Sequence, residues 1–167
     1  MHFLVIITAL ASLSGLGAAV PDEFTALGCP NTTKPEASPS EQLAAWDEFT
    51  NLMYHEKRIS DAFTKYAAAG YINHSPHVTM NGINETIGEL SQIVPYVDSQ
   101  LQRAYVGWDT NGTTYGTAHT KVSGGEAMGI SDSALVDIIR MVGTCLVEHY
   151  DVQQTIEGAG PNPIAFF

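Results

Sequence analysis

Basic residues are scarce in this sequence. Its 167 residues include only seven Lys and Arg against 18 Asp and Glu, which gives a formal net charge of −11. The basic residues are scattered along the chain and form no cluster. Because an acidic surface repels the phosphate backbone of nucleic acids, we expect no nucleic acid as a partner.

Cysteine is scarcer still: the sequence contains two, Cys29 and Cys145. Neither has a second cysteine nearby, which excludes a cysteine-rich metal site. In an oxidising compartment an even pair favours one disulfide, here between the start of the mature chain and the tip of a C-terminal hairpin. Closing a loop of roughly 100 residues contributes on the order of 4–5 kcal/mol in the chain-entropy model. Two unpaired thiols are the alternative.

Several signatures of common enzyme classes are missing. The sequence contains no Gly-x-Ser-x-Gly, no P-loop and no dinucleotide fingerprint. Interpretations as a hydrolase of that type, a nucleotide enzyme or a nicotinamide enzyme therefore lack support.

Charge is also missing from the first 19 residues, which contain no Asp, Glu, Lys or Arg. An apolar run from Leu4 to Leu16 is followed by small residues at 17–19. This pattern predicts a secretory signal peptide over 1–19, with the mature chain starting near Val20. A membrane anchor is the alternative, although the run is short for a span. No later segment approaches that length, so we expect no membrane association after cleavage.

Four Asn-X-Ser/Thr triplets follow the predicted signal peptide, and together with it they favour a glycosylated secretory protein of a eukaryote. The acceptor residues are Asn31, Asn73, Asn84 and Asn111. Asn73 is the weakest acceptor because Pro76 directly follows its triplet.

The rest of the chain predicts one domain over 40–157, between an extended lead-in at 20–39 and a tail at 158–167 that folds back on the domain. Apolar residues recur at helical spacing after a cap at Ser40 and again through a second segment that ends at Gly70. A third helix begins at Asn81 or Asn84 and ends at Pro95, while residues 71–77 are irregular. From Leu101 the period changes to two, which predicts strands near 101–108, 113–122, 130–142 and 145–154.

The last two predicted strands carry the most informative pattern. If their turn centres near Thr144, Asp137 lies opposite Asp151, Ile139 opposite His149, and Arg140 opposite Glu148. Since side chains alternate between the faces of a strand, Asp137, His149 and Asp151 share one face. Arg140 and Glu148 then form a cross-strand ion pair on the other face. Two carboxylates and an imidazole on one face are suited to acid–base chemistry.

Helices followed by an antiparallel meander indicate an α+β fold, with the N-terminal helices closing one side of a strongly curved sheet. Two segments also resemble a known family. The Tyr71–Pro76 segment (Tyr-Ile-Asn-His-Ser-Pro), followed by Gly82, is similar to an element of SnoaL-like proteins. The hairpin over 136–154 is similar to that family's Val-Asp-Ile-Phe-Arg…Ile-Val-Glu-His-Trp-Asp hairpin. The chain thus resembles a secreted, fungal-type SnoaL-like member of the NTF2-like superfamily.

The resemblance implies an NTF2-like cone with a pocket and cofactor-free chemistry of the kind seen in polyketide cyclases, dehydratases and isomerases. We therefore expect an enzyme that cyclises, isomerises or dehydrates a small apolar carbonyl compound. The expected catalytic residues are Asp151, His149, His74 and Asp137. The expected substrate contacts are His119, Tyr115, Tyr71 and Tyr150.

Several alternatives stay open at this stage. His74 could instead cap the next helix, and His119 could be a half-exposed strand histidine. His74, His149 and an Asp could form a metal site, although no local spacing enforces one. The protein could also be a secreted binding protein with the same pocket and no turnover. A second copy of the chain, in a homodimer, is a further candidate partner.

Overall fold

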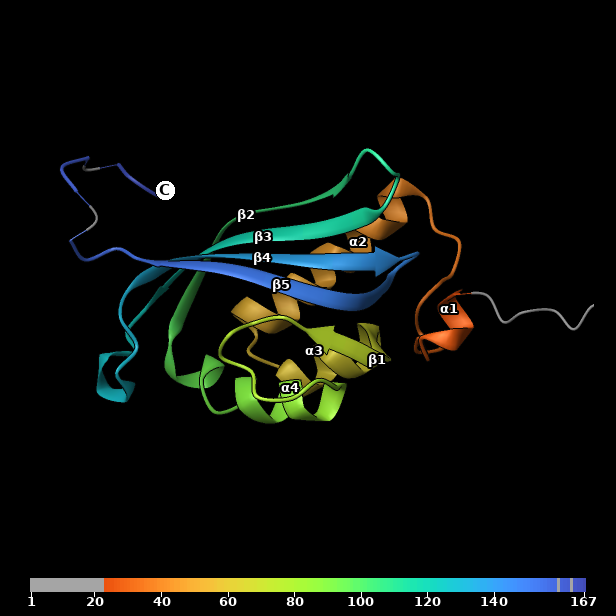
Figure 1. Ribbon diagram of the computed structural model, residues 1–167, viewed down its shortest axis with the longest axis horizontal. Coiled ribbons are helices and arrows are strands. Elements are labelled where there is room, and N and C mark those ends of the chain that lie inside the picture. The colour runs from red at the N-terminus through yellow and green to blue at the C-terminus, as the bar shows by residue number, and fades with distance from the viewer. Residues whose placement is uncertain (1–22, 159, 163) are drawn as a thin grey trace, which may run out of the picture.

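The computed structural model describes residues 23–158, 160–162 and 164–167. The predicted signal peptide at 1–19 lies outside these residues. A five-stranded curved sheet forms one layer, and helices form a second layer against one of its faces (Figure 1). The helical segments are α1 (Glu23–Ala26), α2 (Pro39–Thr50), the π-helical η1 (Asn51–His55), α3 (Ile59–Tyr66), α4 (Ile83–Leu90), η2 (Val94–Tyr96) and η3 (Glu126–Met128). The strands are β1 (Ala67–Asn73), β2 (Asp98–Trp108), β3 (Thr114–Ser123), β4 (Ser133–Val142) and β5 (Cys145–Thr155).

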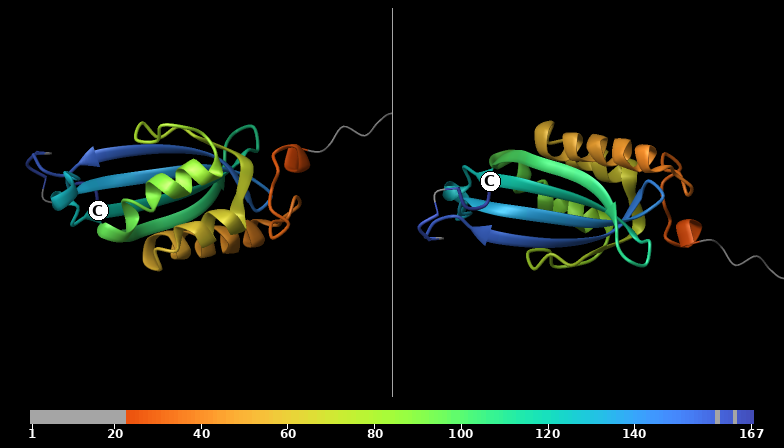
Figure 2. Two further views of the ribbon diagram at one scale, coloured as in Figure 1. Left: turned by 90° about the horizontal axis from the view of Figure 1, so that it is seen from below. Right: turned by 90° about the horizontal axis from the view of Figure 1, so that it is seen from above.

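The sheet has the strand order β1-β5-β4-β3-β2. Strands β2 to β5 form the predicted antiparallel meander, whereas β1 joins β5 in parallel. The two views of Figure 2 show α2, α3 and α4 on one side of the sheet and the described strands without a helical cover on the other. We call these the inner and the outer face. The fold is α+β, with helices packed against one face of a curved sheet, as predicted.

The longest described helix, α2, is capped by Ser38, two residues before the predicted cap, and its first helical residue is Pro39. The Ser38 side chain accepts the Glu41 backbone N–H, and the Glu41 carboxylate accepts the Ser38 backbone N–H, which together form a capping box. The helix buries Trp46 and Phe49 against the inner face. A Cβ on Gly116 would lie 2.5 Å from the Trp46 ring, so β3 needs a glycine where the indole crosses it.

The prediction that residues 71–77 are irregular was wrong for the first three, because Tyr71, Ile72 and Asn73 belong to β1. Residues 74–77 lie outside any helix or strand, as predicted. This strand follows α3 directly, and Asn73 pairs with His149 of β5. The third helix is also shorter than predicted, since α4 ends at Leu90 and the chain reaches Pro95 through turns and η2.

Both ends of the described chain are fastened to the sheet. Cys29 and Cys145 form the predicted disulfide, which closes a sequence separation of 116 residues. At the C-terminus the Phe167 ring stacks on His119 with 5.4 Å between ring centroids, so the end of the tail folds back on the domain. Within the described part of the chain, no helix is long and apolar enough to cross a bilayer.

Candidate functional site

A buried carboxylate, Asp137, is the centre of the candidate site. One of its oxygens, Oδ2, accepts the Tyr54 hydroxyl at 2.5 Å. The other, Oδ1, lies 2.8 Å from Nε2 of His149. The side chains of Asp137 and His149 are each only 12% exposed. Asp137 and His149 therefore lie together on one face of the sheet, as predicted, and both side chains are largely shielded from water.

The register of β4 and β5 creates this pair. Asp137 lies opposite Asp151, Ile139 opposite His149, and Arg140 opposite Glu148, as the sequence predicted. Ile139 is buried in the main core, which identifies the face of Asp137 and His149 as the inner one. The predicted Arg140–Glu148 ion pair is also present on the outer face, with Nε to Oε2 at 3.0 Å.

His149 has an oxygen acceptor at each of its ring nitrogens. Its Nδ1 lies 2.8 Å from Oδ1 of Asn73, and its Nε2 faces Oδ1 of Asp137. The amide orientation of Asn73 follows from the Ser75 backbone N–H, which donates to the same Oδ1 at 3.0 Å. Since a carbonyl oxygen cannot donate, Nδ1 of His149 carries a proton. A second proton must then lie between Nε2 and Asp137, on one side or the other.

Two buried tyrosines lie next to this shared proton. Burial, with the negative charge of Asp137 as a second cause, raises the pKa of both Tyr54 and Tyr71 far above the ordinary range. Tyr54 therefore stays a hydrogen-bond donor. The Thr120 side chain is close enough to lower the pKa of Tyr54 slightly. Its completely buried hydroxyl makes no hydrogen bond of ordinary geometry.

Asp151 lies one residue pair further along the inner face, opposite Asp137, and is half-buried. Within the described residues its carboxylate forms no hydrogen bond or ion pair. The inner face thus holds a paired carboxylate at Asp137 and a free one at Asp151.

His74 lies on the other side of the sheet from this pair. Its Nε2 is 2.8 Å from Glu148 Oε1, and its ring stacks on Tyr150 with centroids 4.5 Å apart. The Tyr150 hydroxyl donates to Glu148 as well. These bonds, that to His74 first, lower the pKa of Glu148. The structure therefore places His74 and Tyr150 in an outer cluster around Glu148, away from Asp137.

The predicted contacts on β3 also separate from the site. His119 pairs with Val136 and Tyr115 with Arg140, whereas Ala118 is the residue opposite Asp137. His119 and Tyr115 therefore share the outer face. There His119 lies 2.8 Å from Arg103 and stacks on Phe167. Of the four predicted substrate contacts, Tyr71 alone belongs to the buried surroundings of Asp137.

Sequence reasoning missed Tyr54 and did not give Asn73 a role in the site. Tyr54 lies on the π-helical η1, whose wider turn buries Leu52, Met53 and Tyr54 in succession. A search at helical spacing finds Met53 and passes over its neighbour. Asn73 was visible in the sequence only as a glycosylation triplet.

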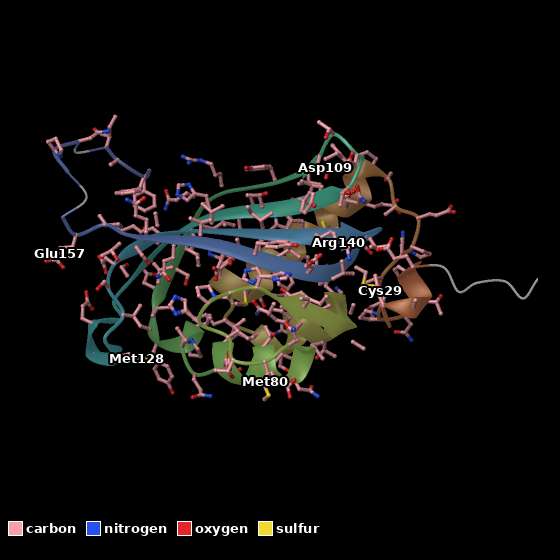
Figure 3. The ribbon with its side chains drawn as sticks, viewed as in Figure 1. Cys29, Met80, Asp109, Met128, Arg140 and Glu157 are labelled. Carbon is pink, nitrogen blue, oxygen red and sulfur yellow. A yellow bond between two sulfur atoms is a disulfide. The ribbon has the colours of Figure 1, made fainter. Side chains whose placement is uncertain are left out.

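The two best-defined hollows in the described part of the molecule are lined by neither Asp137 nor His149. One of about 480 Å³ lies between the β3–β4 connection and the end of β5, near the labelled Met128 and Glu157 of Figure 3. The other, of about 260 Å³, lies between the start of α3 and the Ser91–Pro95 segment. No group of three His, Cys, Asp or Glu side chains gathers to hold a metal ion among the residues described. The three-residue metal alternative has no geometric support, because His74 and His149 lie on opposite faces.

No protein-family profile matches this sequence, and neither does any curated protein. Solved structures do match. TsrD from Streptomyces laurentii is 16% identical, with 71% of this chain and 92% of that chain covered and a TM-score of 0.53. An LEH-like epoxide hydrolase from M. tuberculosis is 13% identical, covers 70% and 84%, and has a TM-score of 0.50. A protein assigned as a SnoaL-like polyketide cyclase from Jannaschia is 16% identical, covers 71% and 90%, and has a TM-score of 0.48. At these identities, the likeness to TsrD and to the epoxide hydrolase establishes a shared fold and nothing beyond it.

Proposed function

We propose that this protein is a cofactor-free acid–base enzyme that acts on a small apolar carbonyl compound in the secretory pathway. The observation that carries the proposal is the contact between Nε2 of His149 and Oδ1 of Asp137, which are largely buried and 2.8 Å apart. Two such atoms need one proton between them. Buried titratable groups with a specific charged partner are a general property of catalytic sites. A pair that can hold or release one proton is what general acid–base catalysis requires.

In the proposed step, the Asp137 carboxylate accepts a proton from the carbon next to the substrate carbonyl, which leaves an enolate. The Tyr54 hydroxyl and the His149 imidazolium stabilise the charge on Asp137 before the step. Return of the same proton to a different carbon is an isomerisation, and its transfer to a departing hydroxyl is a dehydration. Attack of the enolate on a second carbonyl, with the proton passed to the new alkoxide, is a cyclisation.

The apolar core on the inner side of the sheet favours an apolar substrate. Partly buried aliphatic side chains of α4 and β2 pack against this core: Ile83, Ile87, Leu90, Leu101, Ala104 and Val106. Only Thr86 of α4 is fully buried. A helix with one buried residue separates from a core more readily than α2 does. We therefore assign substrate entry to a movement of α4 away from the inner face.

Three features support the secretory pathway. The charge-free leader predicts export, the disulfide between Cys29 and Cys145 suits an oxidising compartment, and three acceptor asparagines are exposed. A non-catalytic binding protein is the competing function, and it needs no proton transfer at Asp137.

Deuterium exchange separates the two functions. We would incubate the secreted protein in D₂O with a panel of apolar ketones and follow both binding, by native mass spectrometry, and deuterium uptake at carbon. The enzyme reading predicts uptake above the solvent rate with at least one bound ketone, and loss of uptake in Asp137→Asn. Tight binding across the panel without any exchange would leave the binding-protein function.

A further inference from the structure

Asn73 combines two properties that exclude one another. Its triplet, Asn73-His74-Ser75, is a glycosylation signal, yet its side chain points to the buried imidazole. The amide Nδ2, which would carry the sugar, is 3.4 Å from the hydroxyl of the fully buried Thr86. A glycan at this nitrogen would compete with the contact to Thr86.

The contacts of Asn73 hold its side chain in one orientation. Its Oδ1 accepts from the Ser75 backbone and from Nδ1 of His149, while its own backbone N–H donates to Asn81 Oδ1 at 2.9 Å. The first and last of these bonds come from the loop that follows β1. This loop is thereby connected to the ring orientation of His149 without touching Asp137.

We infer that Asn73 is a positioning residue that keeps the Nδ1 proton of His149 in place, so that Nε2 is the nitrogen that exchanges a proton with Asp137. A histidine tautomer is set by the hydrogen bond made at the nitrogen that does not react. Asn73 acts through His149, and its importance for turnover rests on the proposed function. It follows that the triplet at 73–75 is not used for glycosylation in the folded protein.

The ring nitrogens of His149 can be observed directly by ¹⁵N NMR of the full mature chain, with His149→Gln used for assignment. The wild-type protein is expected to show a protonated Nδ1 over the whole pH range in which it stays folded. Asn73→Ala should lose that signal to a mixture of tautomers. Asn73→Asp, which keeps an acceptor oxygen and cannot carry a glycan, should restore it. An unchanged Nδ1 signal in Asn73→Ala would overturn the inference.

Ser75→Ala is the matched control, because it destroys the triplet and leaves the backbone N–H that orients Asn73. We expect wild-type spectra from it. In exchange assays, Asn73→Ala should lose about tenfold or more and Ser75→Ala nothing. A glycan found on Asn73 of the folded, secreted protein would overturn the inference. The predicted spectra without exchange in any variant would support the positioning role and reject the proposed function.

Discussion

Replacing Tyr54 by Phe tests whether the hydrogen bond to Asp137 stabilises the site as the structure indicates. The change keeps the buried ring and its packing, and it removes a single hydroxyl that donates to Oδ2 at 2.5 Å. A hydrogen bond to a charged acceptor contributes about 1.5–3 kcal/mol. Because Tyr54 is buried, water has little access to the place of the lost donor. We expect the free energy of unfolding to fall by about 2–3 kcal/mol.

Urea denaturation with the disulfide intact measures this loss. With a slope of about 2 kcal/mol per molar urea, the midpoint should fall by roughly 1–1.5 M. Tyr66→Phe is the matched control, since the Tyr66 hydroxyl also donates to a carboxylate, Glu48, at 2.7 Å. The Glu48 side chain is 47% exposed and also pairs with Lys65. Removal of the Tyr66 hydroxyl should therefore lower the free energy of unfolding by less than about 1 kcal/mol. Equal losses in the two variants would refute the reasoning.

Four further predictions concern the rest of the molecule. Joint replacement of Cys29 and Cys145 by Ser should cost about 5 kcal/mol for a 116-residue separation, measured by urea unfolding, and two alkylatable thiols in the native protein would contradict the bridge. Thr120→Val should raise the free energy of unfolding by about 1 kcal/mol, because the buried hydroxyl lacks a partner; a loss would reveal one. Glu148→Gln should be less stable than the wild type above pH 4.5, and the difference should shrink as pH falls below it. The reason is that the folded protein lowers the pKa of Glu148, so that its contacts stabilise the ionised carboxylate and are lost when it is protonated. A difference in stability that is independent of pH would reject this explanation. Peptide mass spectrometry should find glycans at the exposed Asn31, Asn84 and Asn111, and their absence from all three would contradict passage through the secretory pathway.

The hairpin was predictable in detail because its own residues determine its pairing. Apolar and polar residues alternate through β5, and a tight turn at Gly143 and Thr144 leaves one register that buries Ile139. The same argument placed Arg140 opposite Glu148. Local pattern was sufficient wherever two paired strands are adjacent in sequence.

β1 was missed because its partner is far away in the sequence. Ala67, Ala68, Ala69 and Gly70 carry no period of either kind, and they continue directly from α3. Their strand conformation depends on distant partners. Ala67 pairs with Leu146 of β5, about 80 positions later, and the backbone N–H groups of Ala69 and Gly70 donate to Gly28 and Leu27. The interaction of Asn73 with His149 depends on the same pairing, so no local signal could reveal it.

The face of β3 was a different kind of error. His119, Thr117 and Tyr115 do share a face, but it is the outer one. The inner row consists of Thr114, Gly116, Ala118, Thr120 and Val122, all buried. Small residues at alternate positions, with a glycine under Trp46, were the available signal that helices pack closely there.

The central claim is that Asp137, paired with His149, is the base, and not the free carboxylate of Asp151. The most direct test compares deuterium uptake by the best exchanging ketone in Asp137→Asn and Asp151→Asn, two nearly isosteric changes at positions opposite each other in the sheet. The account predicts that Asp137→Asn reduces exchange to the solvent rate, while Asp151→Asn keeps exchange within about tenfold of the wild type. Full exchange in a folded Asp137→Asn protein, with loss in Asp151→Asn, would contradict it.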